Sequence, residues 1–134
     1  MAVKVQTETK GAVLSDLLLY EVDYRWSRQQ VSLAATEAAL PMGTVLEVSS
    51  TTGSYSALGI TTTGESGSQT STVNAAVAVL LDDAPISTSA QDVMVLLRGA
   101  VVAGEKLHFG TTITADMKKT AKAALTTLGI VVKE

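Results

Sequence analysis

The sequence of 134 residues contains no cysteine, two prolines and few aromatic side chains: three tyrosines, one tryptophan and one phenylalanine. The absence of cysteine excludes disulfide bonds, cysteine-based zinc sites and thiol catalysis, and leaves the redox compartment undetermined. No apolar run reaches the roughly 18 residues of a membrane-spanning helix. The first 13 residues, MAVKVQTETKGAV, have no apolar signal core, so we expect neither a membrane partner nor secretion by that route.

The charge of the chain and the absence of known motifs exclude further classes of function. The net charge is −3, the pI is about 5.1 and no basic patch is present, so we expect no nucleic-acid partner. The sequence has no Walker loop, dinucleotide fingerprint, nucleophile elbow or metalloprotease helix. The only histidine, His108, lies between Leu107 and Phe109, and Asp82-Asp83 follow an apolar run as turn residues do. We therefore predict no enzyme, no catalytic residue, no metal, no cofactor and no small-molecule substrate.

The composition predicts a core that contains few large apolar side chains. About 46% of residues are hydrophobic, but most are Ala, Val and Leu, and only 4% are aromatic. Full burial of a Val or Leu contributes roughly 1.5–3 kcal/mol, and Ala contributes less. One modest domain of this kind favours an oligomer, in which apolar surface is also buried between subunits.

Residues 20–27 alternate between apolar and polar side chains. Tyr20, Val22, Tyr24 and Trp26 occupy every second position, which predicts a strand with one aromatic face. This face either belongs to the chain's own core or docks on something else. Before it, residues 1–13 are polar and are expected to be a disordered leader, and residues 13–20 read as an apolar strand. We interpret residues 1–26 as an arm that orders on a partner and residues 27–134 as the body.

In the body, residues 31–35, 43–50 and 51–60 predict short strands, the last after a turn at Thr52-Gly53. Residues 61–74, rich in Gly, Ser and Thr, predict an exposed mobile loop.

The second half of the chain is richer in apolar residues. Residues 73–83 and 92–104 predict the best buried strands, and residues 107–113 predict another short one. Arg98-Gly99 at a strand end is either a charge pair with a bulge or a subunit contact. Helical spacing over residues 114–129, with Thr114 as the cap, predicts one C-terminal helix followed by a last strand.

Several short blocks, in order, resemble the phage head decoration proteins of the lambda D-protein type. The blocks are Thr7-Glu8, Ser27-Arg28, Val31-Ser32-Leu33-Ala34, Gly43-Thr44-Val45-Leu46, Gly53-Ser54-Tyr55, Ala78-Val79-Leu80-Leu81-Asp82-Asp83, Val93 to Gly99 and Leu128 to Val132. The resemblance implies a small β-rich α+β protein with one C-terminal helix and an extended N-terminal arm. It implies trimers on the outer surface of the expanded virion head, near three-fold sites, where they bind the major capsid protein and stabilise the shell.

The arm and one further residue are the predicted contact sites. The arm residues expected to contact the capsid are Val3, Val5, Thr7, Glu8, Leu17, Leu19, Tyr20, Val22, Tyr24 and Trp26, and Arg98 is the possible subunit contact. Two other classes stay open: another phage structural subunit, from the tail tube or head joint, and a small hydrolase that uses His108.

Overall fold

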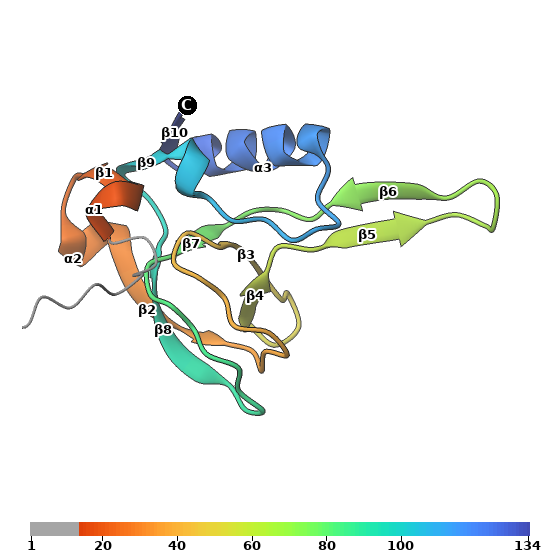
Figure 1. Cartoon of the computed structure of the whole chain (residues 1–134), viewed down its shortest axis with the longest axis horizontal. Helices are drawn as coiled ribbons and strands as arrows, with labels where there is room; N and C mark the ends of the chain where they lie inside the picture. The colour runs from red at the N-terminus through yellow and green to blue at the C-terminus, as the bar shows by residue number, and fades with distance from the viewer. Residues whose placement is uncertain (1–13) are drawn as a thin grey trace, which may run out of the picture.

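The computed structural model describes residues 14–134, whose first elements form a folded corner (Figure 1). The helical turn α1 (Leu14–Leu17) leads into strand β1 (Leu18–Glu21), and the helical turn α2 (Tyr24–Ser27) follows. The strand predicted from residue 20 onward is therefore wrong beyond Glu21. The Asp23 side chain accepts a hydrogen bond from the backbone N–H of Arg25 at 2.9 Å, and such a local bond starts a helical turn in place of a strand.

Five strands close into a barrel. In barrel order they are β2 (Arg28–Leu33), β4 (Tyr55–Ala57), β3 (Val45–Val48), β7 (Ala78–Leu80) and β8 (Gln91–Leu96). The strands predicted over residues 43–50, 51–60 and 73–83 are confirmed at shorter lengths, and the strand predicted over residues 31–35 is found at residues 28–33. The barrel closes because β2 pairs with β8 on one side and, in parallel, with β4 on the other.

A second layer lies beside the barrel. Strand β9 (Ala100–Ala103) pairs antiparallel with β1 and parallel with β10 (Ile130–Lys133), which gives the order β1-β9-β10. Helix α3 (Ala115–Thr127) is capped by Thr114, whose hydroxyl accepts from the backbone N–H of Met117, and Gly129 follows its C-terminal end at φ +93°. The predicted C-terminal helix and last strand are confirmed.

Two further predictions about strands are wrong. Residues 92–104 form two strands, β8 and β9, because the chain turns at Gly99 with φ +62°. Residues 107–113 form no strand: after the short 3-10 helix η1 (Gly104–Lys106), only one bridge joins His108 to Thr44. The segment still contributes to the core, because Leu107 and Ile113 are buried.

The polar segment of residues 61–74 is also more ordered than predicted. Strands β5 (Ile60–Thr63) and β6 (Thr70–Val73) pair antiparallel as a hairpin that projects from the body (Figure 1). Its residues from 61 to 72 are exposed, as the loop prediction requires, but the β-branched threonines favour strand over irregular loop.

Apolar side chains gather in two cores. One lies inside the barrel, around Leu33, Leu46 and Val95, and the other lies between the barrel wall, α3 and the β9-β10 sheet. All three residues of β7 are buried because they alternate between the two cores, which explains the unbroken apolar run of this strand. Among the described helices, none combines the length and apolarity that crossing a membrane would require.

Candidate interaction surface

The β1–α2 corner exposes a cluster of large apolar side chains. Nine large hydrophobic residues are exposed in the described part of the chain, and five of them lie between positions 19 and 26. We call these five the apolar surface: Leu19, Tyr20, Val22, Tyr24 and Trp26. Three of the five aromatic residues of the chain thus face outward from one corner, and large exposed apolar patches mark interaction sites.

Strand register extends the apolar surface across the β1-β9-β10 sheet. Tyr20 pairs with Val101, and Val101 pairs with Val131 on the other side of β9. Tyr20 is 63% exposed and Val131 is 48% exposed, whereas Val102, the next residue of β9, is fully buried. Since neighbouring side chains alternate across a strand, this row lies on the outer face of the sheet and Val102 lies on the inner face.

Trp26 is half exposed but fixed in orientation. The Arg98 guanidinium lies 5.7 Å from the centre of the indole ring, and its Nη1 donates a hydrogen bond to the Trp26 carbonyl. A β-carbon at Gly99 would stand 2.2 Å from the ring, so the ring covers the glycine backbone. An exposed tryptophan held by an arginine has the composition of an interface hot spot.

A groove of about 420 Å³ adjoins the ring. Its lining comes from five separate places in the fold: Trp26, Tyr55, Val77, Leu97, Arg98, Gly99, Leu128 and Gly129. Leu128 is itself 42% exposed at the end of α3. The groove therefore continues the apolar surface onto the body.

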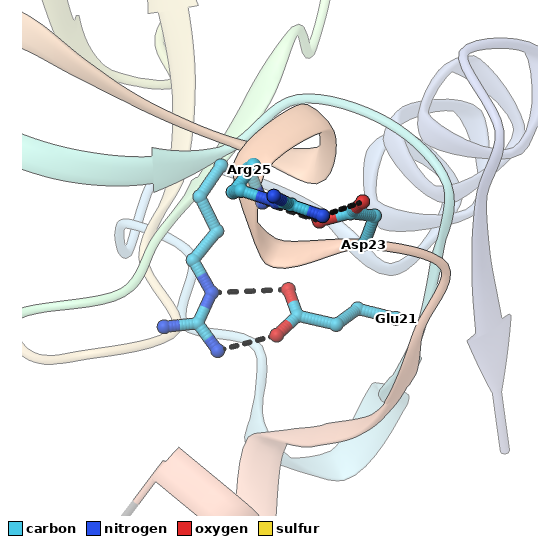
Figure 2. A network of polar contacts seen from close by, with 4 residues as sticks. Glu21, Asp23 and Arg25 are labelled. Carbon is cyan, nitrogen blue, oxygen red and sulfur yellow. Dashed lines mark hydrogen bonds and ion pairs between the residues drawn. The ribbon is translucent and has the colours of Figure 1, made fainter.

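Two ion pairs hold the corner in shape (Figure 2). The Arg28 guanidinium donates to both carboxylate oxygens of Glu21, with Nε to Oε2 at 3.0 Å and Nη2 to Oε1 at 2.5 Å. This hydrogen bonding, chiefly, raises the pKa of Arg28 above its usual value. The backbone N–H of Arg25, and then its guanidinium, lower the pKa of Asp23, whose carboxylate begins α2. The aromatic residues of α2 thus belong to a helical turn that these local interactions stabilise.

The predicted contact residues fall into three groups. Val3, Val5, Thr7 and Glu8 lie outside the described residues. Leu17 is fully buried in the core beside α3, so its prediction as a capsid contact is wrong. The remaining arm residues form the apolar surface.

Arg98, the predicted subunit contact, binds Trp26 of its own chain. The charge pair considered for it is not found within residues 14–134, and the turn at Gly99 stands in place of a bulge. Leu128 and Val131 were missed as surface residues because helical or strand spacing alone does not show which face a neighbouring element covers.

The candidate catalytic groups are spread apart. The side chain of His108 is exposed and makes no hydrogen bond or ion pair with any residue from 14 to 134. Asp83 accepts from the backbone N–H of Met42 at 2.8 Å and Asp82 from that of Met94 at 3.3 Å, so both carboxylates bind backbone groups of other segments. No group of three potential metal ligands comes together in the described part of the chain.

The protein is a small α+β domain, and its described part exposes a large apolar surface. These features are typical of proteins that act by binding other macromolecules. The sequence profile of the family described as bacteriophage lambda head decoration protein D matches residues 6–130. The chain belongs to this family of structural components of the phage head, which confirms the resemblance and the predicted fold class. A search among curated proteins found no match.

Proposed function

We propose that this protein binds as a trimer to the outer surface of an expanded phage head, near three-fold sites, and stabilises the shell. The observation that carries the proposal is the apolar surface, which begins at Leu19, one helical turn after the N-terminal segment of residues 1–13. Together the segment and the surface form one continuous contact with the major capsid protein. The buried Leu17 contributes to the body and not to this contact.

The edge of the sheet supports this mode of binding. Strand β1 is an edge strand in the order β1-β9-β10, so one of its edges has no strand partner among residues 14–134. An extended segment of the capsid protein can add to such an edge, with affinity from backbone hydrogen bonds and specificity from alternate side chains such as Tyr20.

Multivalency supplies the strength of attachment. Three arms on one trimer turn the second and third binding events into intramolecular ones, so a modest affinity for each arm becomes long-lived attachment. A trimer that binds the expanded lattice and not its dissociated subunits stabilises the lattice by mass action.

The test is binding of the purified protein to expanded empty heads, measured by pelleting. We expect Trp26→Ala to weaken attachment by on the order of 2 kcal/mol or more per arm, because an oriented, half-exposed tryptophan has hot-spot character. Its melting temperature should change little, since Trp26 is 51% exposed.

Two control variants make the test specific. Ile86→Ala removes an apolar side chain that is 64% exposed outside the apolar surface, and it should bind as the wild type does. Leu17→Ala should instead cost about 2–5 kcal/mol of folding free energy. A large drop in melting temperature for Trp26→Ala, with unimpaired binding per folded molecule, would make Trp26 an ordinary packing residue and reject the contact.

A further inference from the structure

The β5–β6 hairpin is the least covered element within residues 14–134. It extends from the body at the end opposite the β1–α2 corner (Figure 1). Beyond the half-buried pair Ile60 and Val73, every strand residue is exposed and carries a hydroxyl: Thr61, Thr62, Thr63, Thr70, Ser71 and Thr72. A two-stranded ribbon is marginally stable in water by itself, so a projecting one gains stability from a partner.

The side chains of the hairpin limit what that partner can be. Between residues 60 and 73 the only charged side chain is Glu65, and there is no lysine, arginine or aromatic residue. Neutralisation of phosphate charge, stacking on a base or sugar, and insertion of a large apolar side chain into a groove therefore have no side chain to support them. Recognition falls to the backbone.

The alternation of hydrogen-bonded pairs between β5 and β6 shows which backbone groups of the hairpin point away from the partner strand. The Asn74 N–H donates to the Gly59 carbonyl at 3.0 Å, and the register pairs Thr61 with Thr72 and Thr62 with Ser71. Hydrogen-bonded pairs alternate along an antiparallel ladder, so Thr61 bonds to Thr72 while Thr62 directs its N–H and C=O away from β6. The Thr62 and Ser71 hydroxyls approach to 3.0 Å, as side chains of a non-hydrogen-bonded pair do.

The two edges of the hairpin differ. The β6 side faces helix α3 across a groove lined by Ser71, Thr72, Val73, Asp116, Met117 and Thr120. On the β5 side, within the described part of the chain, no backbone bond outside the hairpin uses Ile60 or Thr62. Natural edge strands are commonly blocked by lysine, proline or a bulge, and the hairpin has none of these.

We propose that β5 pairs antiparallel with β5 of a second copy of this chain, which joins two hairpins into one four-stranded sheet about a two-fold axis. Identical edges satisfy each other's donors and acceptors in such an isologous contact. The strands carry no charge to repel, and facing threonines form favourable cross-strand pairs. On a decorated head the contact would link neighbouring trimers, and this last consequence alone depends on the proposed function.

The experiment compares two proline variants of the full chain by sedimentation equilibrium at rising concentration. Thr62→Pro removes an outward N–H on the β5 edge, and Ser71→Pro removes its counterpart on the β6 edge, so both leave the β5–β6 ladder bonds in place. We expect wild type and Ser71→Pro to associate further as concentration rises. Thr62→Pro should raise the dissociation constant of that step by about tenfold or more.

Hydrogen exchange provides the second readout. The Thr62 amide of the wild type should gain protection with concentration, while the Ser71 amide should not. Absence of any concentration-dependent association, or equal behaviour of the two proline variants, overturns the proposal. Pelleting of Thr62→Pro with expanded heads tests the proposed function separately, because the β5–β6 hairpin lies at the end opposite the β1–α2 corner (Figure 1).

Discussion

At Gly99 the chain turns between β8 and β9 with φ +62°, and the Trp26 ring occupies the space in which a β-carbon would stand. Two requirements therefore meet at one residue. The left-handed conformation favours glycine, and the absence of a side chain lets the indole lie against the backbone. The orientation of Trp26 depends on a residue far along the chain from it.

Replacing Gly99 should disturb both features. We expect Gly99→Ala to cost about 1–3 kcal/mol of folding free energy and to change the emission of Trp26, the only tryptophan. Denaturant unfolding and fluorescence measure the two effects. Gly53→Ala is the matched control, because Gly53 has φ +73° and nothing within 4 Å of its added β-carbon. Equal unfolding free energies and unchanged emission in both variants would contradict the packing of Trp26 on Gly99.

The lowered pKa of Asp23 predicts how the stability of the fold depends on pH. Its pKa is lowered from 3.8, so its contribution to stability is complete above pH 3.8 and is lost as pH falls through the lower folded value. The backbone N–H of Arg25 is the main cause. Arg25→Ala keeps this donor, so the Asp23 pKa should stay below 3.8 while rising toward it. A carboxyl titration by NMR measures both values, and a wild-type pKa at or above 3.8 would contradict the cap.

Among the elements, the β1–α2 corner belongs to the folded body as much as to the arm. Strand β1 pairs with β9, and the Glu21–Arg28 pair ties the corner to β2. Burial of Leu17 adds an apolar anchor. Within the arm predicted for residues 1–26, residues 14–26 therefore contact the body directly.

Deletion of residues 1–13 should separate attachment from folding. The truncated protein should keep its circular dichroism spectrum and its subunit assembly, because the described core residues, from Leu17 to Ile130, pack against one another. Its pelleting with expanded heads should fall, because the proposed contact loses its N-terminal half. Undiminished pelleting of a folded truncated protein would confine the contact to the apolar surface.

At the scale of the whole molecule, the apolar content is divided between two small cores and an exposed surface. The cores consist mainly of Ala, Val, Leu and Ile, while the tryptophan and two of the three tyrosines are more than half exposed. A protein that leaves its largest apolar side chains outside its own core gains stability when a neighbouring molecule covers them.

The trimer that is part of the proposed function can be tested on the free protein in solution. Sedimentation equilibrium of the purified protein at micromolar concentration should yield three times the chain mass of 13.9 kDa. A stable monomer would contradict this expectation. Rings or tubes would favour the alternative that the chain is a tail-tube or head-joining subunit, and gel filtration distinguishes these assemblies from a discrete trimer.

Local signals in the sequence were sufficient for part of this fold. Helix α3 was predictable because its cap at Thr114, its 3.6-residue spacing and its stop at Gly129 act within one segment. The buried strand β7 was predictable from its unbroken apolar run. Family membership followed from the order of short blocks along nearly the whole chain, and the profile match over residues 6–130 confirmed it.

Contacts between distant segments decided the rest. Alternation between residues 20 and 26 could not reveal that the Asp23 cap ends the strand, nor that β9 and β10 leave Tyr20 on the outer face of the sheet. Leu17 and Leu19 are both leucines, yet only the first meets the core beneath α3. Residue spacing determines which side chains share a face, whereas the elements that pack on that face determine whether it is core or surface.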